Sequence, residues 1–465
     1  MDNSNFKKPI LMSEYKKIIN TSTINCKSIN NNNNNNNSLN RKRKRTDGRE
    51  SPLTIESDDH NGSDKPRVKY GELVILGYNG FLPQGDRGRR RSKFVLYKRS
   101  QHNGVKRSKH YIVQSPETTH AILDTNQHSI SYTLSRNQAV IVEYQEDDNT
   151  DMFQVGRSSE PPIDFVVMDT LPGDKKDSKV MQSTISRFAC RILVERNGAH
   201  RARIFAAGFD SSRNIFLGEK ATKWQDSIEM DGLTTNGVLI MHPKGKFYGG
   251  NAKCGLWRET TLNGDVFSLR ESRSAQQKGQ PIKEESNILQ DGTLIDLCGA
   301  TLLWRSAEGL QNSPTKRDLE KLVDEINAGR PQCPVGLNTL VIPRKVTLGE
   351  HVNQPYVYLN CGHVQGHHDW GQDKTGARKC PMCLELSPVV HLCMGIEPAF
   401  YVDSGQPTYA FNPCGHMATE KTVKYWANVD IPHGTNGFQA VCPFCATPLS
   451  GSPGYVKLIF QDNLD

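Results

Sequence analysis

The chain has 465 residues, of which 23% are charged and 36% are hydrophobic, and its formal net charge is +8. This length exceeds that of one ordinary domain, and the composition is typical of globular proteins that fold in water. The sequence contains neither a run of about 18 apolar residues nor an apolar N-terminal leader, which argues against membrane insertion and secretion. We therefore expect a cytoplasmic protein.

Residues 1–66 differ in composition from the rest of the chain. They include eight consecutive asparagines at 30–37, few aromatic residues and many Ser, Asp and Lys residues. Such a segment cannot bury enough apolar surface to offset the entropy lost on ordering, so we expect a disordered tail. The tract RKRKR at 41–45 has two interpretations, a signal that adds a nuclear location or a solvated run of charge, and the sequence leaves both open.

Residues 67–311 have the pattern of a β domain. Short runs such as KHYIVQS and QAVIVEYQE alternate with turns rich in Gly, Asn and Asp. In VERNGAHRARIF, Asn197 and Gly198 suit the positive φ angles of a tight turn, so a hairpin is expected there. Many short strands without a helical period predict a sandwich or a barrel.

A helix is predicted next, within 312–330. Its apolar residues recur at helical spacing: Leu319, Leu322, Val323 and Ile326. Gly329 follows them and suits a helix end. We expect this helix to link the β domain to a second domain over 331–465, where the composition changes to Cys, His, Gly and Pro.

The segment 331–465 contains an internal repeat. LNCGH, a tryptophan and KCPMC are followed by NPCGH, a tryptophan and VCPFC. Each copy has a Cys-x-His and a Cys-x-x-Cys pair, whose short spacing lets each pair approach a metal from one turn. Taken in chain order, the predicted ligands form a first set, Cys361, His363, Cys380 and Cys383, and a second set, Cys414, His416, Cys442 and Cys445. An exchange of pairs between the two sites stays open.

Four nitrogen or sulfur ligands in each set match tetrahedral zinc, so we expect two Zn²⁺ ions. Because no ligand position is left open, both ions are expected to be structural, and the domain should need them to fold. The alternative is that these cysteines are small buried hydrophobic residues. Nearby residues without a repeat partner are expected to be packing or surface residues: His367, His368, His391 and Cys393. The role of Cys333, in CPVG, stays open.

Cys-Gly-His, a tryptophan and Cys-Pro-x-Cys resemble the second metal site of a RING finger. The doubled arrangement, together with RPQCPVG, VYLNCGH and HGTNGF, resembles the RING-like domain of Pellino ubiquitin ligases. The resemblance implies an E3 ubiquitin ligase that binds a ubiquitin-charged conjugating enzyme and forms no covalent ubiquitin–cysteine intermediate. Proximity and orientation would make the aminolysis effectively intramolecular. The implied docking residues for the conjugating enzyme are Trp370, Pro381, Trp426 and Pro443.

The β domain offers residues that suit a phosphate group. Arg157 follows a glycine, Ser186 precedes Arg187 in TISRF, and Thr235 precedes Asn236 in LTTNGV. Guanidinium groups bind phosphate through paired charge-assisted hydrogen bonds, and hydroxyl and amide groups add further contacts. Their order resembles that of the forkhead-associated (FHA) domain, which reads phosphothreonine and occurs in the Pellino family. The resemblance implies that Arg157, Ser186 and Arg187 bind phosphate. It also implies that Thr235 and Asn236 contact the peptide.

The expected fold is a mainly β FHA-type sandwich over 67–311, followed by a small zinc-stabilised α+β RING-like domain. The resemblance implies a wing insertion in the sandwich, for which 82–111 and 247–287 are the candidate segments. The implied function is ubiquitination of phosphorylated substrates, such as interleukin-receptor-associated kinases in Toll and interleukin-1-receptor signalling. A non-enzymatic phosphopeptide-binding scaffold is the alternative. Nucleic-acid binding is a weaker hypothesis, because the zinc loops lack dense Lys and Arg.

Overall fold

The computed structural model describes residues 67–78, 93–116, 119–167, 184–226, 229–344, 354–368, 370–371, 377–433 and 437–461. The expected N-terminal tail and its RKRKR tract therefore lie outside the described residues. Residues 64–465 form one compact unit by their contacts. Within the described residues, no helix is both long and apolar enough to cross a membrane.

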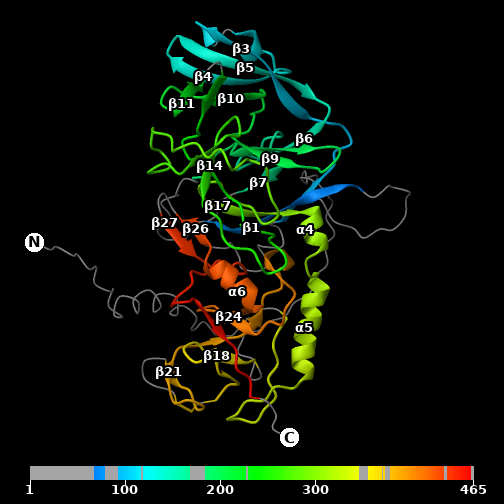
Figure 1. Cartoon of the computed structure of the whole chain (residues 1–465), viewed down its shortest axis with the longest axis vertical. Coiled ribbons are helices and arrows are strands. Elements are labelled where there is room, and N and C mark those ends of the chain that lie inside the picture. The colour runs from blue at the N-terminus through cyan, green and yellow to red at the C-terminus, as the bar shows by residue number, and fades with distance from the viewer. Residues whose placement is uncertain are drawn as a thin grey trace, which may run out of the picture. The chain divides into compact units, whose positions relative to one another are not determined.

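The N-terminal part of this unit is a β-sandwich (Figure 1). One sheet has the order β15-β14-β13-β16-β17-β1-β2, with β1 at Lys69–Tyr78, β2 at Lys93–Tyr97, β13 at Val238–Met241, β14 at Arg258–Thr260, β15 at Val266–Ser268, β16 at Leu294–Asp296 and β17 at Ala300–Ser306. The other has the order β7-β6-β8-β9, with β6 at Thr150–Gly156, β7 at Phe165–Val166, β8 at Cys190–Glu195 and β9 at Ala202–Ala206. This sandwich confirms the predicted mainly β fold.

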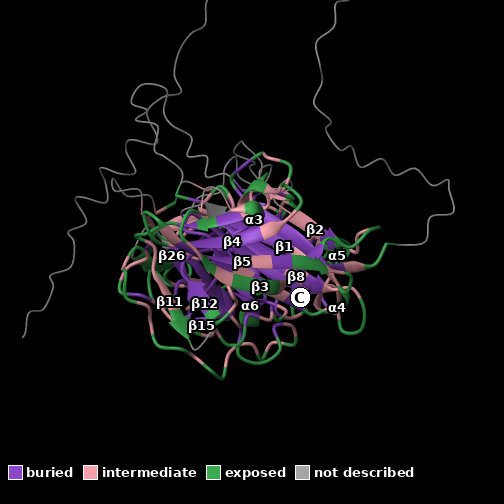
Figure 2. Ribbon diagram, turned by 90° about the horizontal axis from the view of Figure 1, so that it is seen from above, coloured by how far each residue is buried: buried purple, intermediate pink, exposed green. Residues whose placement is uncertain are grey.

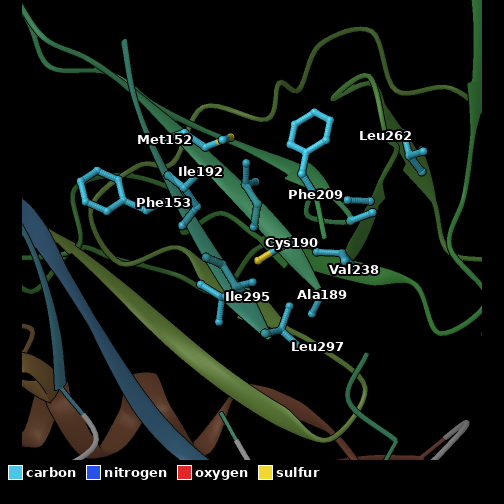
Figure 3. Close-up of a cluster of buried hydrophobic side chains, with 14 of the residues drawn as sticks. Met152, Phe153, Ala189, Cys190, Ile192, Phe209, Val238, Leu262, Ile295 and Leu297 are labelled. Carbon is cyan, nitrogen blue, oxygen red and sulfur yellow. The ribbon is translucent and has the colours of Figure 1, made fainter. Parts of the chain in front are cut away.

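Apolar side chains from both sheets form the core of the sandwich. Phe153 and Ile192 come from β6 and β8, and Ile295 comes from the opposite sheet (Figure 3). The predicted hairpin joins β8 to β9 through Gly198, whose φ of +75° suits glycine. Burial of these apolar residues is the main force that holds the two sheets together.

A further four-stranded sheet extends the sandwich. Its order is β10-β4-β5-β3, with β3 at Gly104–Val113, β4 at His128–Ser135, β5 at Gln138–Asp147 and β10 at Asn214–Leu217, and it is accompanied by α3 at His120–Leu123 and the hairpin of β11, Lys223–Asp226, and β12, Glu229–Gly232. The candidate wing segment 82–111 thus contributes β3 to this sheet, and it also contributes β2 to the main sheet. The other candidate, 247–287, instead supplies β14 and β15 of the main sheet, which corrects that part of the prediction.

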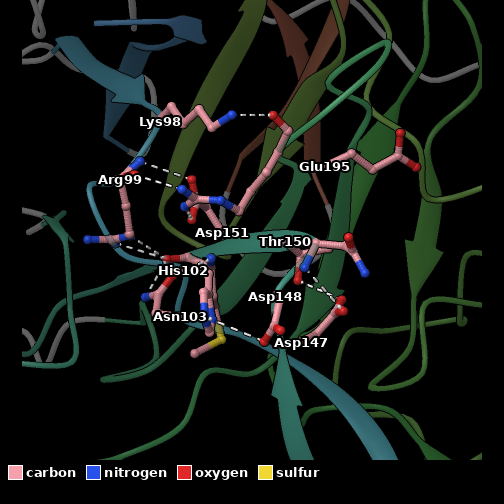
Figure 4. Close-up of polar contacts among 12 residues, drawn as sticks. Lys98, Arg99, His102, Asn103, Asp147, Asp148, Thr150, Asp151 and Glu195 are labelled. Carbon is pink, nitrogen blue, oxygen red and sulfur yellow. Dashed lines mark hydrogen bonds and ion pairs between the residues drawn. The ribbon is translucent and has the colours of Figure 1, made fainter.

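Polar contacts fix the segment that enters this extra sheet to the edge of the sandwich (Figure 4). Arg99 Nη2 donates to the carbonyl of Met152 at 2.9 Å and pairs with Asp164 at 2.6 Å. The amide of Asn103 bonds both the N–H and the C=O of Met152, at 2.8 and 3.1 Å. Side chains therefore form the hydrogen bonds of those backbone N–H and C=O groups of β6 that do not pair with a neighbouring strand.

The described part of the C-terminal domain consists of small sheets, one α-helix and one short 3-10 helix. Its elements are β18 (Tyr356–Tyr358), β19 (Val364–Gln365), β20 (Arg378–Lys379), β21 (Leu386–Ser387), β22 (Val389–His391), β23 (Cys393–Met394), η2 (Pro398–Phe400), β24 (Tyr409–Phe411), β25 (His416–Ala418), α6 (Glu420–Ala427), β26 (Asp430–His433), β27 (Gly437–Ala440) and β28 (Tyr455–Lys457). The sheets have the orders β19-β18-β22, β20-β21, β23-β25-β24-β28 and β26-β27.

Two helices connect the domains, α4 at Ala307–Gln311 and α5 at Lys316–Ala328. The α5 helix begins with a capping box, in which the Thr315 and Asp318 side chains bond each other's backbone N–H groups. Its buried residues, Leu319 and Val323, are four apart and lie on one face. The predicted helical spacing is therefore the spacing of the face that packs inward.

The sandwich and the C-terminal domain share one buried cluster. Its members include Val74, Phe247, Trp257 and Leu303 from the sandwich and Phe400, Tyr425 and Trp426 from the C-terminal domain. Phe247 meets the edge of Tyr425 with ring centroids 5.4 Å apart, and Trp257 Nε1 donates to the carbonyl of Asp430 at 2.7 Å. Figure 2 shows that the strands are mostly buried and the outer loops mostly exposed.

A buried arginine crosses the same junction. Arg305, on β17, donates from Nη1 to the carbonyl of Ala399 at 2.7 Å and from Nε to Asp291 at 3.0 Å. Its guanidinium also lies 4.7 Å from the ring centroid of Phe247. A buried charge is costly unless it is paired and bonded, so these partners fix one arrangement of the junction.

Candidate metal centres and phosphate-binding loops

The first ligand set is assembled by a tight turn. Gly362, between Cys361 and His363, has a φ of +81°, and a Cβ at this position would lie 2.0 Å from the carbonyl oxygen of Lys457. Only glycine fits here. As a result, His363 Nδ1 lies 3.3 Å from Cys361 Sγ and 3.6 Å from Cys380 Sγ.

The second set repeats this geometry. Gly415 has a φ of +74°, and a Cβ would lie 2.1 Å from the carbonyl oxygen of His391. His416 Nδ1 lies 3.4 Å from Cys414 Sγ. The Cys-x-x-Cys turns also match, since the residue after each one, Leu384 or Ala446, has a positive φ and bonds back to the first cysteine.

Both sets fit a tetrahedral metal site. In each set one ligand atom from every residue lies within 4.8 Å of the others. Metal–ligand bonds of 2.0–2.3 Å in a tetrahedron place the ligand atoms roughly 3.3–3.8 Å apart, which agrees with the distances above. A backbone hydrogen bond at Glu385 lowers the pKa of Cys383, and side-chain hydrogen bonding with Cys414 lowers the pKa of Cys445. Burial raises the pKa of Cys361 and Cys442, so each set combines a thiol whose thiolate form is favoured with one whose neutral form is favoured.

The surroundings of the two sets differ sharply. Beside the first set, Trp370 is 42% exposed and Leu384 is 57% exposed, and Pro381 is half-buried. Beside the second set, Trp426 is only 1% exposed and Pro443 is buried. The two expected docking residues of the first copy are thus accessible to a partner protein.

The placement of Trp426 and Pro443 contradicts the expectation that they touch a partner. Trp426 lies on α6, and its Nε1 donates to the carbonyl of Phe400 at 2.8 Å. Its ring packs edge-on against Phe400, with centroids 5.7 Å apart. Both residues therefore lie in the interior, and Trp426 contacts other residues of its own domain.

Neighbouring cysteines and histidines do not join the two sets. Cys333 is buried, and its Sγ accepts from the N–H of Gly336 at 3.4 Å. His368 Nε2 lies 2.7 Å from Gln365 Oε1. Cys393 is buried and lies opposite His416 in the β23–β25 register. Among the described residues, only the eight predicted ligands form such groups.

The residues expected to bind phosphate gather on neighbouring loops of the sandwich. The loop after β6 carries Arg157, which is exposed, and its backbone N–H donates to the carbonyl of Ser186 at 3.1 Å. Arg157 Nε also donates to the carbonyl of Ile185 at 2.7 Å. Arg187 is exposed and lies 3.9 Å from the carboxylate of Glu160. Two guanidinium groups and one hydroxyl therefore lie on adjoining loops.

The turn before β13 adjoins these loops. Asn236 Nδ2 donates to the carbonyl of Thr184 at 2.6 Å and lies 3.4 Å from Ser186 Oγ. Thr235 is exposed in the same turn. Gly237 has a φ of +68°, and a Cβ there would lie 2.6 Å from Glu259 Oε1. The turn thus needs glycine for both its backbone and its packing.

Two supporting residues carry no sequence signal of their own. Arg270 Nη2 donates to the carbonyl of Thr234 at 2.9 Å, and Arg273 Nη1 donates to the carbonyl of Asn236 at 3.1 Å. Both arginines come from the loop after β15, more than 30 residues along the chain from the turn that they hold. No motif in the sequence joins the two segments.

Comparison with known proteins agrees with both halves of this geometry. Residues 61–322 match the family model described as Pellino, FHA domain, and residues 326–465 match Pellino, RING domain. Protein pellino of Drosophila melanogaster is 85% identical over 91% of this chain and 100% of its own length.

Two relatives from mammals have names that state an activity. E3 ubiquitin-protein ligase pellino homolog 2 of Homo sapiens is 58% identical over 88% of this chain and 99% of its own length. E3 ubiquitin-protein ligase pellino homolog 3 of Mus musculus is 53% identical over 86% of this chain and 91% of its own length. With matching models over both domains and relatives at this identity, the chain belongs to the Pellino family.

Proposed function

We propose that this chain is an E3 ubiquitin-protein ligase that captures phosphorylated proteins with its FHA domain and directs ubiquitin to them with its RING domain. The observation that carries the proposal is the exposed apolar surface beside the first ligand set, within a domain that matches the Pellino RING model. The relatives named as E3 ubiquitin-protein ligases support the same activity.

The metal in both sets is proposed to be zinc, with a structural role. Three thiols and one imidazole are a donor set that zinc prefers, and four protein ligands leave no open position for water. The ions would hold the Cys-x-His and Cys-x-x-Cys turns of each set together, and metal binding of this kind contributes to the folding free energy. We expect about two zinc ions per chain by elemental analysis, and a count near zero in folded protein would contradict the assignment.

The conjugating enzyme is proposed to dock at the first set. Trp370, Pro381 and Leu384 offer an accessible apolar surface, together with Met382 and Leu386. An exposed apolar surface of this kind is typical of a protein–protein contact. The ubiquitin thioester on the docked enzyme would then be attacked by a substrate lysine. The isopeptide bond forms, the thioester breaks, and the thiol stays with the conjugating enzyme.

The FHA domain is proposed to bind phosphothreonine. Arg157, Ser186 and Arg187 would contact the phosphate, and Thr235 and Asn236 would contact the peptide. A phosphate dianion between two guanidinium groups forms strong charge-assisted hydrogen bonds. Family membership suggests interleukin-receptor-associated kinases as substrates in Toll and interleukin-1-receptor signalling, and a cytoplasmic location.

The direct test of ligase activity uses the full chain with ubiquitin, its activating enzyme and a panel of conjugating enzymes. We expect polyubiquitin chains with at least one conjugating enzyme, and Trp370→Ala should abolish them. No chains with any member, from a protein that contains its zinc, would favour the non-enzymatic scaffold instead.

The test of the phosphate site is Arg157→Ala, measured by calorimetry with a phosphothreonine peptide. We expect affinity to fall by at least tenfold, because one charge-assisted partner of the phosphate is lost, which is about 1.4 kcal/mol or more. Arg317→Ala, which removes an exposed arginine on α5, is the matched control and should leave affinity unchanged. Equal affinity in both variants would remove the site assignment.

A further inference from the structure

A third turn of the RING domain has the backbone of the two Cys-x-x-Cys turns. In this turn, residues 333–338, the N–H of Leu337 donates to the carbonyl of Cys333 at 2.9 Å, and the N–H of Cys333 donates to the carbonyl of Asn338 at 3.0 Å. The first ligand set has the same two bonds, from Leu384 to Cys380 at 2.7 Å and from Cys380 to Glu385 at 2.8 Å, and the second set has them from Ala446 to Cys442 at 2.7 Å and from Cys442 to Thr447 at 2.9 Å. The residue after each turn has a positive φ, which is +52° at Leu337, +64° at Leu384 and +57° at Ala446.

The third turn closes without a metal ion. Gly336 stands where the other two turns have their second cysteine. A Cβ on Gly336 would lie 2.7 Å from Asn338 Oδ1, so the Asn338 side chain occupies the space into which a second ligand would project. The thiol of Cys333 is buried, and among the described residues Cys333 belongs to no group of possible metal ligands.

The side chains at two matching positions separate the three turns into two kinds. These positions lie two and four residues after the first cysteine. In the third turn they hold Val335, 38% exposed, and Leu337, 72% exposed, and in the first set they hold Met382, 50% exposed, and Leu384, 57% exposed. In the second set they hold Phe444 and Ala446, which are both buried. The third turn therefore resembles the first set, which faces solvent, and differs from the second set, which is internal.

The fold itself does not account for a leucine at position 337. Its side chain contributes little to the core because most of it is exposed. Its φ of +52° lies in the left-handed region, where leucine is disfavoured and asparagine is more readily accepted. An exposed apolar side chain in such a conformation is explained by a contact with another molecule.

The third turn adjoins the first ligand set. Gly366 comes directly after β19, and a Cβ there would lie 3.2 Å from Asn338 Nδ2. The preceding residue, Gln365, donates from Nε2 to Cys380 Sγ at 3.8 Å. Two adjacent residues thus contact the third turn and the first set.

We propose that the turn 333–338 is a second part of the surface that binds the conjugating enzyme, with Val335 and Leu337 as its contacts. The inference rests on the ligase function proposed above and on docking at the first set. A specific protein–protein contact typically involves roughly 20–30 residues on each side, so it has to extend beyond the few apolar residues beside one turn. The third turn offers apolar residues at the matching positions and lies next to that site.

The test uses the full chain and a labelled conjugating enzyme that supports chain formation, with and without a stably linked ubiquitin. Leu337→Asn should lower the affinity for both forms about tenfold, because an apolar contact is lost while asparagine suits the positive φ. Leu384→Asn, at the matching position of the first set, should have an effect of similar size. Val335→Ala leaves the backbone at Leu337 unchanged and should lower the affinity about threefold.

The matched control is Leu123→Asn, which removes a leucine that is 64% exposed on α3 of the sandwich domain. It should leave the affinity unchanged. Zinc content and thermal unfolding of each variant should equal those of the unsubstituted chain. If Leu337→Asn loses zinc or stability, Val335→Ala decides the assignment alone.

Three results would overturn the inference in distinguishable ways. Unchanged affinity in Leu337→Asn and Val335→Ala, with a loss in Leu384→Asn, would leave docking at the first set intact and remove the third turn from it. A loss confined to the ubiquitin-linked enzyme would mean that the turn contacts ubiquitin instead. If the unsubstituted chain binds no conjugating enzyme, the proposed function fails and this inference fails with it.

Discussion

The two ligand sets have the same local geometry but lie in different surroundings. Each has a glycine with positive φ between Cys and His, and each Cys-x-x-Cys turn closes with the same backbone bond. Around the first set the apolar side chains are exposed, whereas around the second set they are buried against the sandwich. A duplicated metal-binding unit can therefore supply a partner surface in one copy and an internal anchor in the other.

The helix α6 explains much of this difference. In the second copy, the segment between the two ligand pairs forms α6, whose Val423 and Trp426 are buried. In the first copy, the described part of the same segment contains the short strands β19 and β20 and a turn, and Trp370 at that turn is exposed. The buried helix face gives the sandwich a surface to pack on.

The largest expected contrast comes from removing one ligand from each set. Cys442→Ser should prevent the chain from folding, because Cys442 is buried in the cluster that joins the domains and structural zinc contributes on the order of 10 kcal/mol. Cys383→Ser, at an exposed ligand, should leave the sandwich folded with about one zinc and no ligase activity. Thermal unfolding, zinc content and phosphopeptide binding measure the difference. Equal loss of fold in both variants would mean that the two sets play equivalent structural roles.

The two tryptophans provide the next contrast. Trp426→Ala should lower the free energy of unfolding by about 3–5 kcal/mol, because it leaves a cavity and removes the bond to Phe400. Trp370→Ala should change it by less than about 0.5 kcal/mol but abolish chain formation with the conjugating enzyme. Chemical denaturation and the ubiquitination assay check both. A large loss of stability in Trp370→Ala would show that the side chains around the first set also stabilise the fold.

Metal removal should separate the sets kinetically. Cys383 is exposed and Cys442 is fully buried, so a chelator should reach the first set at least about tenfold faster. Ligase activity should decay with release of the first equivalent of zinc, and the unfolding signal should follow the second. Release of both equivalents in one phase would contradict the difference in surroundings.

The smallest effect concerns an ion pair at the junction. Lys93 Nζ lies 2.6 Å from Glu397 Oε1, and both side chains are partly exposed. A double-mutant cycle with alanine should give a coupling of about 0.5–1 kcal/mol, reduced at high salt. The exposed pair of Lys424 and Glu420 on α6 is the control, and it should give about 0.3–0.5 kcal/mol. A coupling near zero for the junction pair would mean that this ion pair does not help to hold the domains together.

The sequence predicted the local features well because they depend on residues close together in the chain. The ligand spacings, the Asn197-Gly198 hairpin and the helical face of α5 are of this kind. The burial of Trp426 was missed because it depends on Phe400, which lies 26 residues earlier in the chain. Arg270 and Arg273 were missed for the same reason, since their partners lie in the turn before β13.

Amide hydrogen exchange of the full chain, with and without a conjugating enzyme that supports chain formation, tests most directly whether that enzyme docks at the first set. We expect slower exchange around Trp370 and over 377–387, beside the first set, and no change over 414–446, beside the second. Protection of 414–446 instead, with 377–387 unchanged, would contradict the assignment of the first set as the docking surface.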